Sequence, residues 1–317
     1  MHLQEFRITE EGNFMGTFIN GETAGASAIA IDSISKTYIG KKRVRVEALK
    51  DVSLTVGLGE VFGFLGPNGA GKSTTIKCLV GLMRPTKGTA TIMGESIPSI
   101  ASRRNIGYLP ENPSFYDYLS AEEYIRFVGS AFQMPADELT RKSEEVLKLL
   151  ELWDARKRPI RSYSKGMVQR VGLAQVLVHD PDVYILDEPM SGLDPLGRSL
   201  VKEIISDLKR RGKTVFFSTH IIDDVEKICD RVGIISGGVL KSVEHVDRIL
   251  EQGVTGYTIT AQNDKGETLI LSVDRDGLGD KLTSLATVGC TVSLIEPVRK
   301  NLERFFLDII KESNGPE

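Results

Sequence analysis

The sequence predicts an α/β fold built around a largely parallel sheet, and three features of the chain lead to this prediction. First, four short apolar runs have the near-continuous hydrophobicity of buried strands, at residues 61–65, 183–186, 215–217 and 232–235. Second, helical stretches separate these runs, and strands that alternate with helices usually form a parallel sheet covered on both faces. Third, a different pattern begins after about residue 245, which indicates a small C-terminal α+β domain.

We divide the chain into three parts. Residues 1–27 are polar, rich in Gly and Thr and without a sustained period, so we expect a mobile N-terminal tail. If translation starts at Met15, the residues before it are not native. Residues 28–245 hold the apolar strands and form the main domain, in which a helical subdomain occupies about 111–180. One stretch of this subdomain is expected to place four apolar side chains on one helical face: Val146, Leu149, Leu150 and Trp153.

Residues 246–317 are predicted to form a smaller accessory domain. Two apolar runs, at 257–261 and 268–273, flank a turn that begins at Asn263, which predicts a β-hairpin. A helical pattern at 280–287 and a strand at 291–295 follow. The last helix is amphipathic and is expected to have one apolar face, formed by Leu302, Phe305, Phe306 and Ile309.

Charge and cysteine usage exclude several classes of protein. The 40 Lys and Arg residues nearly balance the 43 Asp and Glu residues, for a net charge of −3, so we expect no nucleic-acid partner and no broad adhesion to anionic lipid. Cys78, Cys229 and Cys290 are widely spaced, which indicates free thiols in a reducing compartment. No apolar run is long enough to cross a bilayer, and the first residues do not resemble a signal peptide. Any membrane role is therefore expected to come through a partner.

A glycine-rich loop follows the strand at 61–65 and precedes a helical run. It matches the motif G-x-x-x-x-G-K-[ST], whose backbone N–H groups curl around phosphate oxygens. We therefore expect a nucleotide site formed by Gly66, Pro67, Asn68, Gly69, Ala70, Gly71, Lys72, Ser73 and Thr74. Lys72 is expected to reach the β- and γ-phosphates, and the Ser73 hydroxyl is expected to bind Mg²⁺. A glycine-rich turn without a ligand is the alternative, and the strand–loop–helix context argues against it.

Two acids end the apolar strand at 183–186. A strand of the same sheet delivers Asp187 and Glu188 to the edge where ligands bind in such folds. Asp187 is expected to hold Mg²⁺ and Glu188 to polarise the attacking water. The alternative, two solvated charges in a surface loop, is disfavoured by the buried strand before them. His220 follows the strand at 214–219 and has two interpretations, a contact to the γ-phosphate or an ordinary loop histidine.

Three further segments give the chain a family resemblance. Ser164, Lys165, Gly166 and Met167 open a helix about twenty residues before the two acids, with Ser164 placed as its cap. A Ser-Gly-Leu-Asp stretch that ends at Asp194 follows the acids directly. Tyr38 precedes the glycine-rich loop. Together with that loop, residues 28–245 resemble the nucleotide-binding domain of ABC transporters, and these segments resemble its signature, its D-loop and the aromatic residue that stacks on adenine.

The resemblance has implications for the fold and the partners. It implies a P-loop NTPase core with an antiparallel β edge, and a head-to-tail dimer with a second ATPase subunit, identical or closely related, that sandwiches two ATP molecules. The signature and Asp194 would contact the ATP of the partner subunit. The chain departs from the family at Lys165 and Met167 of the signature. It also departs at Glu111, which stands where a Gln is usual and whose role in metal contact is therefore doubtful.

Both departures and the C-terminal segment resemble the ATPases of drug-, sodium- and gliding-type exporters. In that branch the membrane permease is a separate integral membrane chain, which would hold this subunit at the cytoplasmic face. The aromatic side chains Phe115, Tyr116 and Tyr118 would line the groove for a permease helix, or else belong to the core of the helical subdomain. The resemblance therefore implies an ATP-hydrolysing motor of an exporter.

Two other functions stay open at this point. ABC-type ATPases also act in translation or DNA maintenance without a permease, usually with two such domains or a long coiled coil. This chain has one domain of the ABC type and no sustained heptads. A nucleotide-binding scaffold that does not hydrolyse ATP is the second alternative, and the presence of both Asp187 and Glu188 argues against it. No residue indicates the transported substrate.

Overall fold

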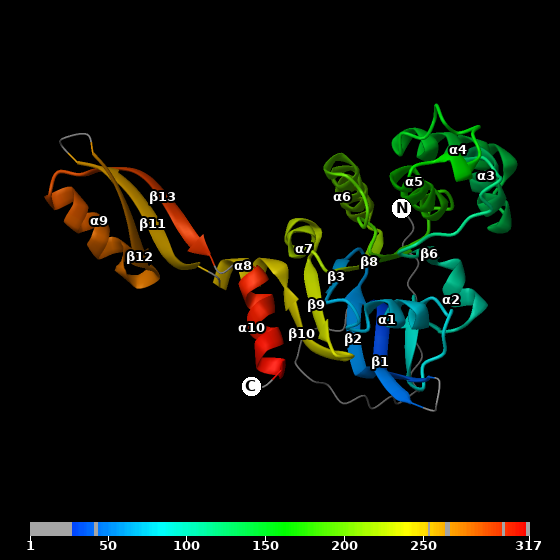
Figure 1. Cartoon of the computed structure of the whole chain (residues 1–317), viewed down its shortest axis with the longest axis horizontal. Coiled ribbons are helices and arrows are strands. Elements are labelled where there is room, and N and C mark those ends of the chain that lie inside the picture. The colour runs from blue at the N-terminus through cyan, green and yellow to red at the C-terminus, as the bar shows by residue number, and fades with distance from the viewer. Residues whose placement is uncertain (1–26, 41–43, 253, 264–266, 300–301, 315–317) are drawn as a thin grey trace, which may run out of the picture.

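The computed structural model describes residues 27–40, 44–252, 254–263, 267–299 and 302–314. Figure 1 shows a central core, a helical lobe on one side of it and a small separate sheet on the other. The predicted N-terminal tail, with the alternative start at Met15, lies outside the described residues except for Ser27. Within the described part, no helix has both the length and the apolar character that a membrane crossing needs.

The core is a six-stranded sheet in the order β10-β9-β3-β8-β7-β6. Its strands are β3 (Val61–Leu65), β6 (Ile106–Leu109), β7 (Val183–Asp187), β8 (Thr214–Thr219), β9 (Arg231–Ser236) and β10 (Val239–His245). All neighbouring pairs are parallel except β9 and β10, which are antiparallel. Every residue of β3 and β7 is buried, which is why both read as continuous apolar runs. The predicted largely parallel sheet is confirmed.

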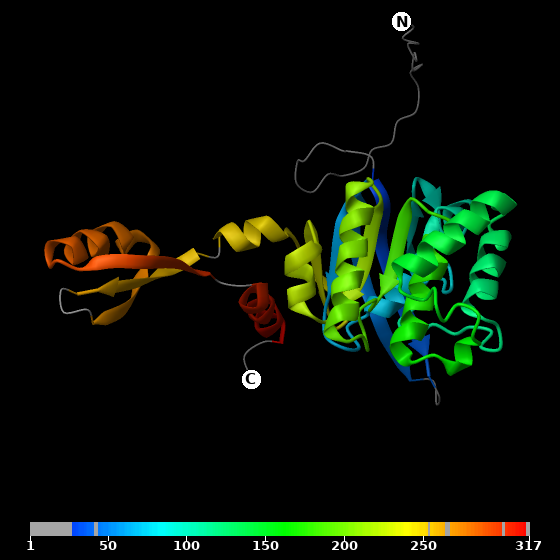
Figure 2. The same cartoon turned by 90° about the horizontal axis from the view of Figure 1, so that it is seen from above.

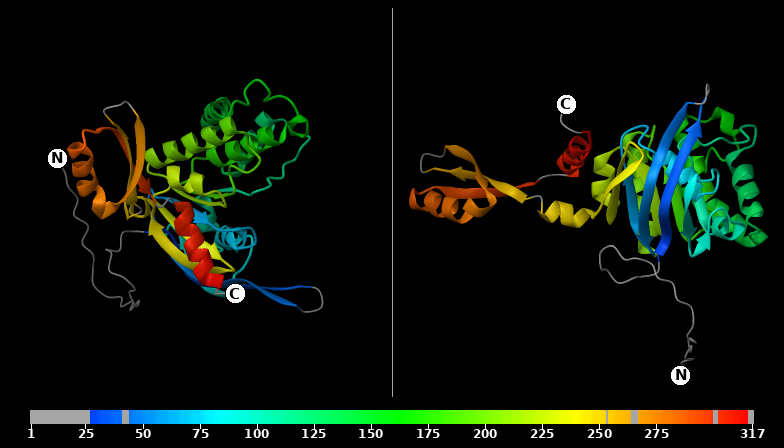
Figure 3. Two further views of the ribbon diagram at one scale, coloured as in Figure 1. Left: turned by 60° about the vertical axis from the view of Figure 1, so that its left-hand side comes forward. Right: turned by 90° about the horizontal axis from the view of Figure 1, so that it is seen from below.

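A second, antiparallel sheet covers one face of the core, in the order β2-β1-β4-β5. Its strands are β1 (Ser27–Ile39), β2 (Arg45–Gly57), β4 (Lys87–Ile92) and β5 (Glu95–Ser96). Side chains of this sheet, such as Ile29 and Val52, share a buried cluster with Phe62, Phe64 and Phe216 of the central sheet. The right panel of Figure 3 shows β1 and β2 crossing in front of the core. The antiparallel β component is therefore a packed layer on the sheet.

Helices complete the covering of the core. On the side of the antiparallel sheet lie α1 (Lys72–Leu79) and the short α2 (Ile100–Arg104), and α1 contributes Ile76 and Leu79 to the shared cluster. On the opposite side lie α6 (Pro195–Arg210) and α7 (Ile222–Ile228), as Figure 1 shows. The side chains of Val201 and Ile205 in α6 pack there with Val215 and Phe217 of β8. The sheet is thus buried on both faces.

The helical lobe lies between β6 and β7 in the sequence. It contains α3 (Ala121–Ala131), α4 (Ala136–Leu149), a 3₁₀ turn η2 (Ile160–Ser162) and α5 (Lys165–Leu177). The face predicted for α4 is wrong at Leu149, whose exposed fraction is 47%, while Leu139, Val146 and Leu150 are buried. The reason is geometric, because the buried stripe of α4 comprises residues 139, 143, 146 and 147, and Leu149 lies about 100° from its centre on a 3.6-residue helix.

The C-terminal part contains a three-stranded antiparallel sheet in the order β12-β11-β13. Its elements are β11 (Val254–Gln262), β12 (Thr268–Asp274), a short turn η3 (Arg275–Gly277), α9 (Leu278–Thr287) and β13 (Thr291–Arg299). The pairing of β11 with β12 confirms the predicted hairpin, although the turn at 264–266 lies outside the described residues. Ile259, Ala261 and Leu285 form a separate small core under α9.

Two helices flank this small sheet in the sequence but pack on the main core. They are α8 (Val246–Gln252) and α10 (Leu302–Asn314). Val246, Ile249 and Leu302 belong to the main hydrophobic cluster, and Phe305 and Phe306 pack against it. Figure 2 shows both helices between the core and the projecting sheet. The apolar face predicted for the last helix therefore has a partner, and that partner is the main domain.

Candidate functional site

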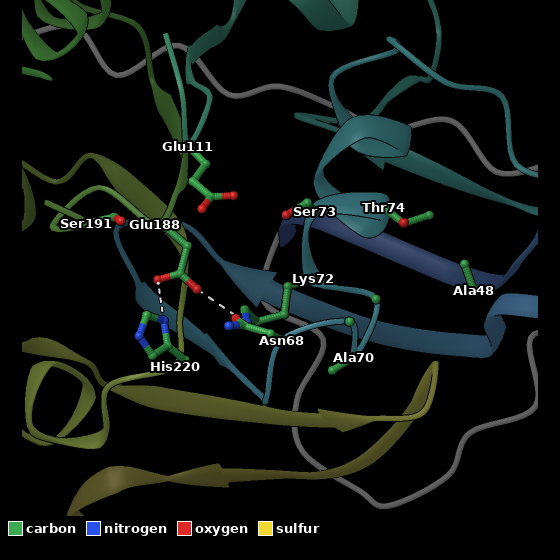
Figure 4. Close-up of a pocket in the computed structure, with 12 residues that line it drawn as sticks. Ala48, Asn68, Ala70, Lys72, Ser73, Thr74, Glu111, Glu188, Ser191 and His220 are labelled. Carbon is green, nitrogen blue, oxygen red and sulfur yellow. Dashed lines mark hydrogen bonds and ion pairs between the residues drawn. The ribbon is translucent and has the colours of Figure 1, made fainter. Parts of the chain in front are cut away.

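The carboxyl ends of the parallel strands meet around a cleft of about 470 Å³. In such folds this edge of the sheet is where ligands bind. Figure 4 shows the lining side chains converging from the loop after β3, from the segments after β6, β7 and β8, and from β2. The lining residues are Ala48, Asn68, Gly69, Ala70, Gly71, Lys72, Ser73, Thr74, Glu111, Glu188, Ser191 and His220.

The glycine-rich loop owes its shape to residues without a side chain. Gly69 and Gly71 have φ values of 79° and 111°, in the region that disfavours other residues. A Cβ added to Gly71 would lie 2.8 Å from the carbonyl oxygen of Ala48, whereas a Cβ on Gly69 would meet nothing within 4 Å. The loop ends at the first turn of α1, so that the N-terminal N–H groups of this helix face the cleft.

Substitutions at these two glycines are expected to differ. Gly71→Ala combines backbone strain with a steric clash and is expected to lower the free energy of unfolding by about 3 kcal/mol. Gly69→Ala adds strain without a clash, and about 1 kcal/mol is expected. Denaturant unfolding of both variants measures the difference. Equal losses would show that the close approach of Gly71 to Ala48 does not limit the loop.

Lys72 lies buried at the base of the loop. Its ammonium donates to the carbonyl oxygens of Gly66, at 2.7 Å, and Pro67, at 3.3 Å. It also forms an ion pair with Glu188, with 3.3 Å between Nζ and Oε1. Both side chains of this pair are less than 10% exposed, so that each charge compensates a partner that burial would otherwise destabilise. Gly66 and Pro67 do not line the cleft. Their carbonyl oxygens help to position the Lys72 ammonium, which does.

Asp187 is held by two hydroxyl groups. Ser73 donates to its Oδ1 from α1, at 3.1 Å, and Ser218 donates to the same oxygen from β8, at 2.6 Å. Asp187 is almost fully buried behind the cleft. Burial, together with the negative charge of Asp187, raises the pKa of the neighbouring Tyr108 to about 12, so its phenol is neutral at physiological pH.

Glu188 occupies the centre of the site. Its Oε1 pairs with Lys72, and its Oε2 lies 2.9 Å from Nδ1 of His220, whose side chain is 48% exposed. Figure 4 marks both contacts. The φ of Glu188 is 49°, a left-handed conformation that costs a residue with a side chain about 1–2 kcal/mol. The backbone N–H of Glu188 donates to Ser218 Oγ at 3.0 Å, which supports this conformation.

A second cleft, of about 340 Å³, lies at the start of α5. Its lining residues are Ser164, Gly166, Met167, Arg170, Gly192, Leu193 and Asp194. Ser164 caps α5, because its Oγ accepts from the N–H of Met167, and Asp194 caps α6 by accepting from the N–H of Gly197. The structure thus brings the predicted signature and D-loop residues together and separates them from the glycine-rich loop.

The two clefts are connected through α5. Gln169 is buried and donates to the carbonyl oxygen of Pro189, the residue after Glu188, at 3.2 Å. The Lys165 side chain lies over Gly192, where an added Cβ would come within 2.7 Å of its Cε. Lys165 itself does not line the second cleft. Helix α5, which begins at the second cleft, is therefore bonded to the segment that follows Glu188 of the first cleft.

Two predicted residues lie at the margin of the first cleft. Tyr38 does not line it, but its hydroxyl is 3.3 Å from Thr74 Oγ1 and 3.0 Å from Met83 Sδ. Glu111 lines it from the segment after β6 and is exposed. The sequence interpretation missed Ala48, Ser218 and Gln169, and it placed Ser191 only in the D-loop, whereas Ser191 lines the first cleft. The only available signal was for Ser218, a polar residue near the end of an apolar strand, and that signal does not reveal its partner.

The parallel sheet, the glycine-rich loop and the acids after β7 define a nucleotide-binding domain of the P-loop class. The family profile described as ABC transporter matches residues 49–191. An ABC transporter ATP-binding protein of a Nostoc species is 42% identical over 286 residues, which are 85% of this chain and 85% of that protein. The Nod factor export ATP-binding protein I of Burkholderia lata is 35% identical over 262 residues, 80% of this chain and 83% of that protein.

A solved structure supports the same assignment. It is the dimer of an ATP-binding cassette in a post-hydrolysis state bound to ADP and Pi, is 26% identical and has a TM-score of 0.64. The similarity covers 69% of this chain and 98% of that one. The chain belongs to the family of ABC transporter ATP-binding proteins.

Proposed function

We propose that this chain hydrolyses ATP as the motor subunit of an exporter whose membrane permease is a separate polypeptide. One observation carries the catalytic part of this proposal. The Glu188 carboxylate lies between Lys72 and His220, beside a phosphate-type loop and a second, buried acid. A carboxylate in this position is suited to accept a proton from water that attacks a phosphoryl group bound in the loop.

The binding step follows from the loop and from Lys72. Phosphate oxygens accept hydrogen bonds from the N–H groups of the loop and of the first turn of α1. Lys72 then exchanges its contacts with Gly66, Pro67 and Glu188 for phosphate oxygens, which releases the Glu188 carboxylate for catalysis. Tyr38, beside Thr74, is placed to stack on the adenine ring.

Ser73 and Asp187 are suited to hold Mg²⁺. Both offer hard oxygen atoms and they already contact each other at 3.1 Å, and Mg²⁺ is usually bound through one or two carboxylates with substrate phosphates and water. The ion, when bound, supplies positive charge to the β- and γ-phosphate oxygens. Glu111 is exposed in the same cleft and is a weaker candidate, because its negative charge would lie near phosphate.

His220 is proposed to orient Glu188 and to contact the γ-phosphate. Its ring nitrogen is within hydrogen-bond distance of the carboxylate, and its partly exposed side chain lines the cleft. When the carboxylate is ionised, the proton lies on Nδ1 and stabilises its charge. The histidine therefore holds the base in place after Lys72 has left Glu188 for the phosphate oxygens.

A complete site is proposed to need a second copy of this chain or a close relative. The cleft of Ser164, Gly166 and Asp194 offers a helix N-terminus and a hydroxyl, which suit an anion, but it lies apart from the glycine-rich loop. In a head-to-tail pair the second cleft of one subunit closes over the ATP in the first cleft of the other. The similar cassette that was solved as a dimer with ADP and Pi supports pairing of two such subunits.

The transport part of the proposal rests on relatives and on one exposed surface. The similar protein of Burkholderia lata is named as an export ATP-binding protein. Of the three aromatic residues predicted for the groove, Phe115 packs against the main core. Tyr116, Tyr118 and the neighbouring Phe127 are more than half exposed, and the ring of Tyr116 contacts the other two, so this surface suits a permease helix. Docking of the permease at this surface would hold the subunit at the cytoplasmic face of the membrane.

Affinity purification of the tagged protein from detergent-solubilised native membranes tests the transport proposal. We expect a polytopic membrane protein to co-purify in near-equal amount, with mass spectrometry as the readout. A variant with Tyr116→Ser and Tyr118→Ser is expected to lose that partner and to keep ATP binding, because both residues lie outside the two clefts. Recovery of ribosomes or DNA-repair factors without a membrane protein would contradict the transport function and leave the ATPase chemistry intact.

A further inference from the structure

We propose that Ser218 is a positioning residue that orients both acids of the site, Asp187 for the metal ion and Glu188 for the attacking water. The inference rests on the proposed function and goes beyond it by assigning a role to a residue outside the cleft. It is carried by the sheet register and by two hydrogen bonds.

The register of the central sheet places Ser218 beside Asp187. In the parallel pair of β7 and β8, Asp187 lies directly opposite Ser218. Residues that face each other on neighbouring strands project to the same side of the sheet, so their side chains are neighbours there. Ser218 is fully buried and Asp187 nearly so, which leaves a short side chain on β8 as the natural partner of the carboxylate.

The Ser218 hydroxyl forms a hydrogen bond with each of the two acids, as the donor to one and as the acceptor from the other. An ionised carboxylate accepts hydrogen bonds only, so the proton of Ser218 Oγ must point to Asp187 Oδ1, 2.6 Å away. A lone pair of the same oxygen then accepts the N–H of Glu188, 3.0 Å away. The hydroxyl has a single proton, which it donates to Asp187, and it accepts a hydrogen bond from Glu188. The two acids together therefore determine the orientation of the Ser218 side chain.

The two bonds have different consequences. The bond to Asp187 turns its Oδ1 toward Ser73, the other proposed metal ligand, whose hydroxyl contacts the same oxygen at 3.1 Å. The bond from the Glu188 N–H supports a left-handed backbone at φ 49° and thereby aims the Glu188 side chain at Lys72 and His220. Loss of the hydroxyl is therefore expected to disturb metal binding and catalysis together.

The test compares Ser218→Ala with Thr214→Val. Thr214 is a matched control, because it is a buried hydroxyl residue on the same strand and bonds to Gly57 and Gly59 at the opposite end, away from the acids. Two measurements are made on each full-length variant: the steady-state rate of ATP hydrolysis, and Mn²⁺ binding in the presence of ADP, followed by electron paramagnetic resonance.

We expect Ser218→Ala to lower kcat about tenfold and to raise the half-saturating Mn²⁺ concentration several-fold, about the effect of one hydrogen bond to a charged group. Affinity for ADP in EDTA is expected to stay within about twofold of the wild type, because the loop contacts do not involve Ser218. Thr214→Val is expected to match the wild type in both measurements. Ser218→Cys, which keeps a weak donor of similar shape, is expected to give an intermediate value and replaces Ser218→Ala if that variant does not fold.

Two results would overturn the inference. One is a Ser218→Ala protein with wild-type kcat and Mn²⁺ binding. The other is a Thr214→Val protein whose kcat and Mn²⁺ affinity fall as far as those of Ser218→Ala, which would indicate a general effect on strand β8. Failure of the proposed function is a separate outcome, because it would show as a wild-type protein without Mg²⁺-dependent ATP hydrolysis.

Discussion

Replacing Glu188 by glutamine is expected to slow ATP hydrolysis by about 10²- to 10⁴-fold while leaving ATP binding intact. The amide keeps the shape of the side chain but cannot accept the proton of the attacking water. Lys72, which pairs with Glu188 at 3.3 Å, loses a competing anion and keeps the carbonyl oxygens of Gly66 and Pro67. Because ATP no longer competes with that carboxylate for Lys72, its affinity is expected to equal or exceed that of the wild type.

The same variant is expected to accumulate as an ATP-bound dimer. If hydrolysis normally opens the dimer, its loss traps the closed state, which light scattering during size-exclusion chromatography detects with ATP and not with ADP. Glu203→Gln, the same change at an exposed glutamate outside both clefts, is the control and is expected to behave as the wild type. A Glu188→Gln protein that binds ATP yet stays monomeric at high concentration would contradict the proposed dimer.

Mixing two inactive variants is expected to restore hydrolysis if each site is shared between two subunits. Lys72→Ala removes the phosphate-binding cation of the first cleft, and Gly166→Glu places a carboxylate in the second. A Cβ at Gly166 would lie 3.8 Å from Leu193, so the backbone there accepts a side chain. Each homodimer lacks a complete site, and each is expected to lose about 10²-fold or more in rate.

The mixed dimer has one intact site, made from the first cleft of the Gly166→Glu chain and the second cleft of the Lys72→Ala chain. With random pairing of equal amounts, half of the dimers are mixed, so about a quarter of the wild-type rate is expected. The control mixes Gly166→Glu with the Lys72→Ala/Gly166→Glu double variant, in which no pairing gives a complete site. A mixture as inactive as this control would show that the two clefts do not combine between subunits.

Local signals predicted most of what lies within one segment. The loop from Gly66 to Thr74 needs residues that are adjacent in the chain, because glycine backbone freedom and a following helix make a phosphate-type loop wherever they occur together. The predicted cap at Ser164 is local for the same reason, since a cap bonds to an N–H only three residues away. Buried strands such as β3 and β7 can also be predicted locally, because their sequences are continuously apolar.

Contacts between distant segments could not be predicted in this way. Helical periodicity placed Leu149 on the buried face of α4, but the face that is buried depends on where α3 and α5 lie. The last helix was assigned to the accessory domain, whereas α10 packs on the main core beside α7 and α8. Amphipathic character shows that a helix has a partner and does not identify it.

The sequence alone therefore determined the class of fold, the phosphate-type loop and the presence of two acids at a strand end, because each depends on neighbours in the chain. Only the tertiary structure decided that Glu188 lies between Lys72 and His220, that the second cleft is separate from the first, and that Ser218 joins both acids. The physical reason is the order of the strands: β8 lies between β3 and β7, and that order depends on long-range pairing that no local pattern encodes.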